Sequence, residues 1–138
     1  MVRHGELRGT VLLAEDEPGI LFTFAAALEE AGFDVQSAQT FRSAQMSIRQ
    51  NDYDAVITEF SLDRDGTGLE LAQEAKKRKR APAILVYTDD PTVERLRAAL
   101  ALGVDYFAFK PVDLDEIKTA LFRLVAFRAE RLTAASDS

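Results

Sequence analysis

Three carboxylates, a hydroxyl and an ammonium stand at the ends of short apolar runs in this sequence. Carboxylate oxygens suit a hard divalent cation, and such a cation offsets the repulsion between a carboxylate nucleophile and a phosphoryl group. A lysine and a hydroxyl can hold the phosphoryl oxygens. These residues therefore predict the chemistry of a metal-assisted phosphoryl acceptor. They are Glu15 and Asp16 after Val11–Ala14, Glu59 at the end of Ala55–Glu59, Thr88 at the end of Ala83–Thr88, and Lys110 after Tyr106–Phe109.

Segments of helical periodicity alternate with these apolar runs. Leu21, Phe24 and Leu28, for example, have the spacing of a helix with one apolar face. Five such strand–helix units predict an α/β fold, a doubly wound (βα)5 sandwich with a parallel sheet covered by helices on both faces. The strands are expected at Val11–Ala14, Val35–Ala38, Ala55–Glu59, Ala83–Thr88 and Tyr106–Phe109, with helices starting near Pro18, Phe41, Leu69, Pro91 and Asp113.

The polarity of the runs indicates their places in the sheet. Val35–Ala38 is half polar and is expected at an edge, whereas the apolar runs that begin at Val11, Ala55 and Ala83 are expected at the centre. Ligand sites in such folds lie outside the carboxyl ends of the strands. We therefore expect the five chemically capable side chains to converge on one cleft.

Composition narrows the class of protein. The chain has 138 residues, which suits one domain, and a net charge of −6, which argues against nucleic-acid binding. It has no cysteine, a single histidine (His4) and no apolar stretch of membrane-spanning length. We expect a cytoplasmic protein without a membrane contact. Its domain should occupy residues 10–128, between flexible ends at 1–9 and 129–138.

Four motifs in order resemble the receiver domain of two-component response regulators, the CheY-like family. They are Leu13–Pro18 (LAEDEP), Tyr53–Glu59 (YDAVITE), Gly68–Leu71 (GLEL) and Gly103–Pro111 (GVDYFAFKP). The resemblance covers about residues 9–127. It implies a five-stranded parallel sheet of order 2-1-3-4-5, as in flavodoxin and CheY, and a role in two-component phosphorelay signal transduction through protein contacts, not enzymatic turnover.

The resemblance also implies roles for individual residues. Glu59 takes the phospho-acceptor position, and Thr88, Phe107 and Lys110 take the positions that sense the phosphoryl group. Lys110–Pro111 is a bond that is commonly cis in the family. Weak Mg²⁺ binding is expected through Glu15, Asp16, Glu59 and the backbone carbonyl of Ser61. The expected partner is a sensor kinase or a downstream effector, bound at the face of the fourth helix, fifth strand and fifth helix, with the chain a monomer or weak homodimer.

Two departures from the family pattern argue against ordinary phosphorelay. The acceptor position holds Glu59 instead of aspartate, and the added bond moves the carboxylate by about 1.5 Å. A misplacement of about 1 Å can cost on the order of a hundredfold in an orientation-dependent reaction. The position after Thr88, usually small in the family, holds Asp89, whose charge disfavours an incoming phosphoryl group. These departures predict an atypical receiver, or pseudo-receiver.

Glu59 then has two interpretations. It is a phosphomimic that reaches Lys110 and Thr88, or it marks lost phosphorylation in a domain that still binds a partner.

Alternatives from other classes of protein are a Mg²⁺-dependent phosphotransfer enzyme or phosphatase in the same carboxylate cleft, and a nucleotide- or flavin-binding module. The acidic loop Glu15–Gly19 disfavours the last, because it would repel phosphate.

Overall fold

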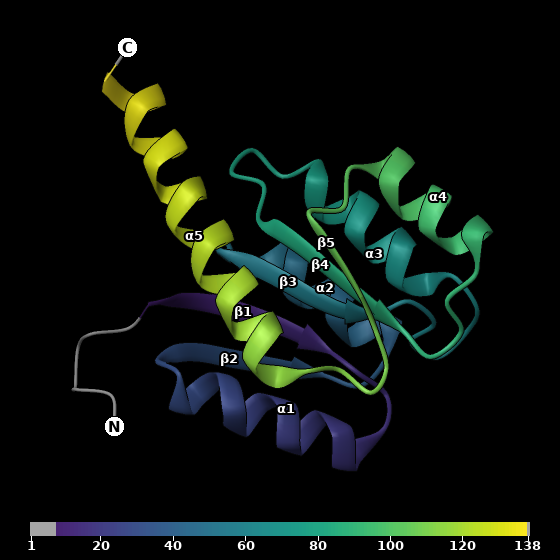
Figure 1. Cartoon of the computed structure of the whole chain (residues 1–138). Helices are drawn as coiled ribbons and strands as arrows, with labels where there is room; N and C mark the ends of the chain where they lie inside the picture. Colours follow the sequence, from purple (N-terminus) through teal and green to yellow (C-terminus); the bar gives the residue numbers. More distant parts are fainter. Residues whose placement is uncertain (1–7, 138) are drawn as a thin grey trace.

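The computed structural model describes residues 8–137, and its centre is one parallel five-stranded sheet of order β2-β1-β3-β4-β5 (Figure 1). The predicted fold and strand order are confirmed. β1 and β2 begin earlier than predicted, because Gly9 and Phe33 already lie opposite each other in the parallel pairing. The strands are β1 (Gly9–Ala14), β2 (Phe33–Ala38), β3 (Ala55–Glu59), β4 (Ala83–Thr88) and β5 (Tyr106–Phe109).

Helices cover both faces of the sheet (Figure 1). They are α1 (Pro18–Glu30), α2 (Phe41–Gln50), α3 (Thr67–Lys76), α4 (Val93–Leu102) and α5 (Leu114–Asp137). Alternate strand residues point to opposite faces. Val11 and Leu13 of β1 therefore pack against α1 and α5, whereas Leu12 and Ala14 pack in the cluster that includes α2 and α3.

The two ends of the chain differ from the sequence-based expectation. Gly9 lies in β1, and the expected flexibility of residues 1–7 falls outside the described residues. Residues 129–138 were predicted to be a flexible tail, yet α5 continues to Asp137. The segment holds good helix formers such as Ala129, Glu130 and Arg131, and it has neither proline nor glycine. The segment is therefore helical where a tail was expected, and its flexibility stays a prediction.

Two close backbone approaches shape the carboxyl edge of the sheet. A Cβ atom at Gly68 would overlap the carbonyl oxygen of Glu59, so glycine lets the start of α3 pack directly on the end of β3. The Gly68 amide donates to the Phe60 carbonyl at 2.9 Å. The Lys110–Pro111 peptide bond, which follows β5, is cis, as the motif predicts.

Among residues 8–137, no helix combines the length and the apolar character needed to cross a membrane.

Candidate functional site

The ammonium group of Lys110 lies between two buried carboxylates at the carboxyl edge of the sheet. Its Nζ atom is 3.2 Å from Glu15 Oε1 and forms an ion pair with Glu59 Oε2. The Lys110 side chain is 19% exposed, whereas Glu15 is fully buried and Glu59 nearly so. The three charges come from the residue after β1, the last residue of β3 and the residue after β5, as the parallel topology predicts.

Glu15 is held by two further donors. The Tyr87 hydroxyl donates to Glu15 Oε1 at 2.9 Å, and the Glu17 amide donates to Glu15 Oε2 at 3.0 Å. Tyr87 is itself fully buried and lies opposite Glu59 in the pairing of β3 with β4. Tyr87 was not among the predicted site residues. A signal was present, because a hydroxyl within an otherwise apolar buried strand needs a hydrogen-bond partner.

The two glutamates have different electrostatic environments although they share one lysine. Burial acts to raise the pKa of Glu15, but the Glu17 amide, the Tyr87 hydroxyl and Lys110 outweigh it and lower that pKa. Burial raises the pKa of Glu59, and Lys110 offsets only part of the rise. Burial acts to lower the pKa of Lys110, but the Glu59 and Glu15 carboxylates outweigh it and raise that pKa. Lys110 is therefore a stable internal cation.

Two of the predicted magnesium ligands, Glu15 and Glu59, already contact protein groups in this arrangement. Both oxygens of Glu15 already have protein partners, and the Lys110 ammonium contacts the Glu59 carboxylate. Asp16 is exposed as a whole. The pKa of its carboxyl is nevertheless raised, first by the loss of some surrounding water and then by the neighbouring Glu15 carboxyl. Within the described part of the chain, no three acidic or histidine side chains are arranged to hold a metal ion.

Thr88 is fully buried, and its hydroxyl is engaged with α4. Its Oγ atom accepts from Arg95 Nη1 at 2.9 Å and from the Asp90 amide at 3.1 Å. No donor in residues 8–137 forms a well-aligned hydrogen bond to the carboxylate of Glu59. The phosphomimic interpretation requires Thr88 to turn toward Glu59. In the structure the Thr88 hydroxyl is instead bonded to Arg95 and the Asp90 amide. Sequence reasoning could not identify Arg95, because only the tertiary structure places this residue beside Thr88.

The other predicted residues lie around the same edge. Phe107 on β5 is half-buried against the core cluster that includes α2 and α3, and its ring makes an edge contact with Phe109 at 5.8 Å. Asp89 is exposed directly after β4. The Ser61 hydroxyl donates to Asp65 Oδ1 at 2.9 Å. The structure therefore brings Glu15, Glu59 and Lys110 into direct contact, and Thr88 belongs to a separate network.

The comparisons with known proteins agree with this geometry. The family model described as "Response regulator receiver domain" matches residues 11–122, most of the chain. This chain belongs to the response regulator receiver family. Receiver domains are signalling modules of two-component systems and interact with kinases and effectors. The family match gives no support to the alternative of a phosphotransfer enzyme or phosphatase.

Among curated proteins, this receiver domain is similar to the photosynthetic apparatus regulatory protein RegA of Rhodobacter capsulatus. The two are 32% identical over 113 residues, which are 81% of this chain and 60% of RegA. A second relative is the KDP operon transcriptional regulatory protein KdpE of Escherichia coli, 29% identical over 92% of this chain and 55% of KdpE. The chain thus spans less than two thirds of either protein.

Solved receiver structures have the same fold. The signal receiver domain of a putative Luxo repressor protein from Vibrio parahaemolyticus superposes with a TM-score of 0.83 at 19% identity, over 93% of this chain and 98% of that one. The receiver domain of the sensor histidine kinase PA1611 from Pseudomonas aeruginosa superposes with a TM-score of 0.74 at 23% identity, over 86% and 98%. The latter structure has a magnesium ion coordinated in its active-site cleft.

Proposed function

We propose that this chain is a receiver that signals by binding a protein partner without accepting a phosphoryl group at residue 59. The contact between Glu59 and Lys110 carries the proposal, since the ammonium that would hold a phosphoryl oxygen already has an anionic partner. Glu15 holds the same ammonium from the other side. The site supplies one negative charge at residue 59, whereas phosphate would supply nearly two.

Magnesium is not required in the proposed state. In a phospho-accepting receiver, a divalent cation would neutralise crowded oxygens, and the candidate ligands are Glu15, Asp16, Glu59 and the Ser61 carbonyl. Here Lys110 supplies one positive charge, shared between the Glu15 and Glu59 carboxylates, from within the fold. We therefore expect Mg²⁺ to bind weakly.

The proposed partner surface is the face of α4, β5 and α5. Val93 and Leu100 on α4 are 64% and 63% exposed, and Phe109 at the end of β5 is 52% exposed. Side chains of this size and exposure favour a protein contact when they gather on one face. A sensor kinase, a downstream effector or a second copy of the chain can each bind such a face.

An affinity capture with this receiver as bait tests the proposal. The bait carries Leu100→Glu, Phe22→Glu or no substitution, and capture is repeated with and without acetyl phosphate. Phe22 is the matched control, because it is an exposed apolar residue on α1. We expect the unsubstituted bait and the Phe22→Glu bait to capture one partner, and the Leu100→Glu bait to fail to capture it. Acetyl phosphate should not change the amount captured. A partner retained only after phosphodonor treatment would contradict the proposal.

A further inference from the structure

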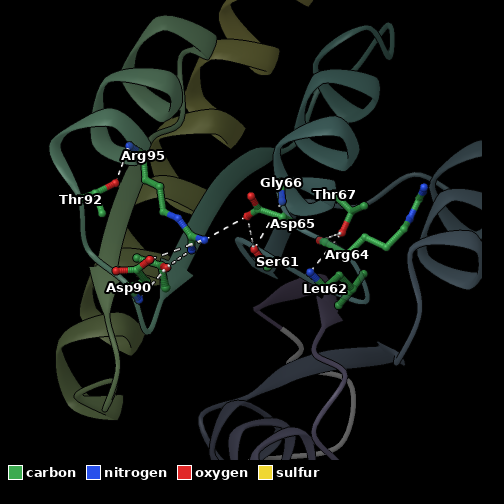
Figure 2. Close-up of polar contacts among 10 residues, drawn as sticks. Ser61, Leu62, Arg64, Asp65, Gly66, Thr67, Asp90, Thr92 and Arg95 are labelled. Carbon is green, nitrogen blue, oxygen red and sulfur yellow. Dashed lines mark hydrogen bonds and ion pairs between the residues drawn. The ribbon is translucent and has the colours of Figure 1, made fainter.

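Arg95, in the first turn of α4, joins three segments at the carboxyl edge of the sheet (Figure 2). Its Nη1 donates to Thr88 Oγ1 at 2.9 Å, and its Nη2 donates to Asp65 Oδ1 at 3.0 Å. The Asp90 carboxylate lies 3.9 Å from Nη2, and the guanidinium lies 4.4 Å from the centre of the Phe60 ring. One side chain thus connects α4, the end of β4 and the loop between β3 and α3.

Both ends of this connection are fixed by their own neighbours. The Thr92 hydroxyl caps α4 by accepting from the Arg95 amide at 3.1 Å, which fixes the backbone that carries the guanidinium. On the opposite side, Asp65 also accepts from the Ser61 hydroxyl, so the carboxylate is positioned before it meets Arg95 (Figure 2). The Arg95 side chain is 19% exposed whereas the Asp65 side chain is 83% exposed, so salt screens this ion pair more than it screens the more buried bond to Thr88.

The connection determines what Thr88 can do. A hydroxyl has two acceptor lone pairs, and those of Thr88 receive Arg95 Nη1 and the Asp90 amide. The Arg95 bond is charge-assisted, and such bonds are stronger than neutral ones. Turning Thr88 toward residue 59 would break it and leave a guanidinium nitrogen without its partner. Thr88 is therefore held on the α4 side of the edge.

We propose that Arg95 is a clamp that fixes Thr88 and the first turn of α4 independently of the charge on residue 59. In this chain the position of α4 then depends on Arg95, Asp65 and Thr88, whereas Glu59 and Lys110 form a separate pair. The clamp is a contact within the domain, so it can be tested on the isolated domain without the partner.

Amide hydrogen exchange across α4 tests the clamp in four proteins: the natural chain, Glu59→Gln, Arg95→Met and the double variant. Exchange in α4 is compared with that of β1 amides, which report global opening. Neutralising residue 59 alone should leave relative exchange in α4 unchanged. Arg95→Met should raise it by about tenfold, because local opening of a helix end costs less once its tether is removed. Equal effects of Glu59→Gln and Arg95→Met would overturn the proposal.

A readout on Thr88 separates a clamp from a merely stabilising contact. In the natural chain the methyl resonance of Thr88 should be insensitive to Glu59→Gln, and in the Arg95→Met background the same substitution should shift it. Arg97→Met is the control, because Arg97 is exposed on the same helix and should leave α4 unchanged. Arg95→Lys is a milder variant that keeps the charge but loses the two-nitrogen fork, and it should also speed exchange. A Thr88 methyl that responds to residue 59 with Arg95 in place would contradict the clamp.

Discussion

At the scale of single residues, the defining contact is between Glu59 and Lys110. Two buried carboxylates share this ammonium, and one of them, Glu15, has additional donors in Tyr87 and the Glu17 amide. A buried charge is costly unless it is paired and hydrogen-bonded. The four side chains Glu15, Glu59, Tyr87 and Lys110 therefore depend on one another.

Removing the ammonium should destabilise the fold. Lys110→Met leaves two buried carboxylates without their cation, and we expect a loss of about 3 kcal/mol in the free energy of unfolding, measured with urea. Lys118→Met is the control, because Lys118 pairs with the exposed Asp115 and should cost under about 1 kcal/mol. Added Mg²⁺ should stabilise Lys110→Met more than the natural chain, since the freed carboxylates can then bind it. Equal stability of Lys110→Met and the natural chain would contradict the shared-ammonium description.

The buried hydroxyl of Tyr87 gives a second residue-level prediction. Tyr87→Phe removes the donor to Glu15 Oε1 and leaves its acceptor with Lys110 alone. We expect a loss of about 1–3 kcal/mol in urea unfolding, the cost of an unsatisfied buried polar group. Tyr106→Phe, at a half-buried position on β5, should cost less. An unchanged midpoint for Tyr87→Phe would show that its hydrogen bond does not matter.

The raised pKa of Glu59 predicts the pH dependence of stability. Between the ordinary glutamate value of 4.5 and the higher folded-state pKa, the folded protein holds a proton that the unfolded chain has released. Its free energy of unfolding therefore falls as pH rises through this window. Relative to Glu59→Gln, the natural chain should lose stability from the ordinary value upward toward neutral pH, in urea titrations of both proteins. A relative stability that grows with pH would mean that Lys110 outweighs burial at residue 59.

At the scale of elements, α5 is anchored by one buried arginine. Arg128 donates to the carbonyl oxygens of Ala81 and Arg80 at 2.8 and 2.9 Å, and to Asp54 Oδ1 at 2.8 Å. Asp54 in turn accepts from the Thr10 amide at 2.8 Å. These bonds connect the helix to the amino edge of the sheet, opposite the site.

Truncating this anchor should weaken the docking of α5. Arg128→Ala leaves a carboxylate and two carbonyl groups without their donor, and we expect a loss of about 2–4 kcal/mol by urea unfolding. Arg131→Ala on the same helix is the matched control. Arg131 stacks on the exposed ring of Phe127, so its removal should cost about 0.5 kcal/mol or less. Similar losses for both variants would contradict the anchor.

The elements could be predicted from the sequence to different degrees. Buried strands stand out because β3 and β4 each begin with an apolar run, and their carboxyl ends at Glu59 and Thr88 coincide with the predicted ones. The end of α5 could not be placed, since Ala134 and Ala135 suit a helix but the neighbouring serines and aspartate also suit a tail. Residue types predicted the contact of Lys110 with the acidic side chains. The contacts of Tyr87 and Arg95 depend on packing between elements far apart in the chain.

At the scale of the whole molecule, the frame is that of a receiver domain, and the charged site lies at its carboxyl edge. The sheet order, the cis bond after β5 and the helices on both faces are those of a receiver domain. At the centre, the Glu59 carboxylate is paired with Lys110, and the Thr88 hydroxyl is bound to Arg95 of α4. We infer that the surface of α4, β5 and α5 is presented in one state instead of two.

The most direct test is the intact mass of the protein after incubation with acetyl phosphate and Mg²⁺. The natural chain should show no stable addition of a phosphoryl group, because Lys110 is held by Glu59 and a glutamate side chain is one bond longer than an aspartate. Glu59→Asp restores the shorter side chain and should gain the addition, which makes it the positive control. A stable single addition to the natural chain that Glu59→Gln abolishes would contradict the account.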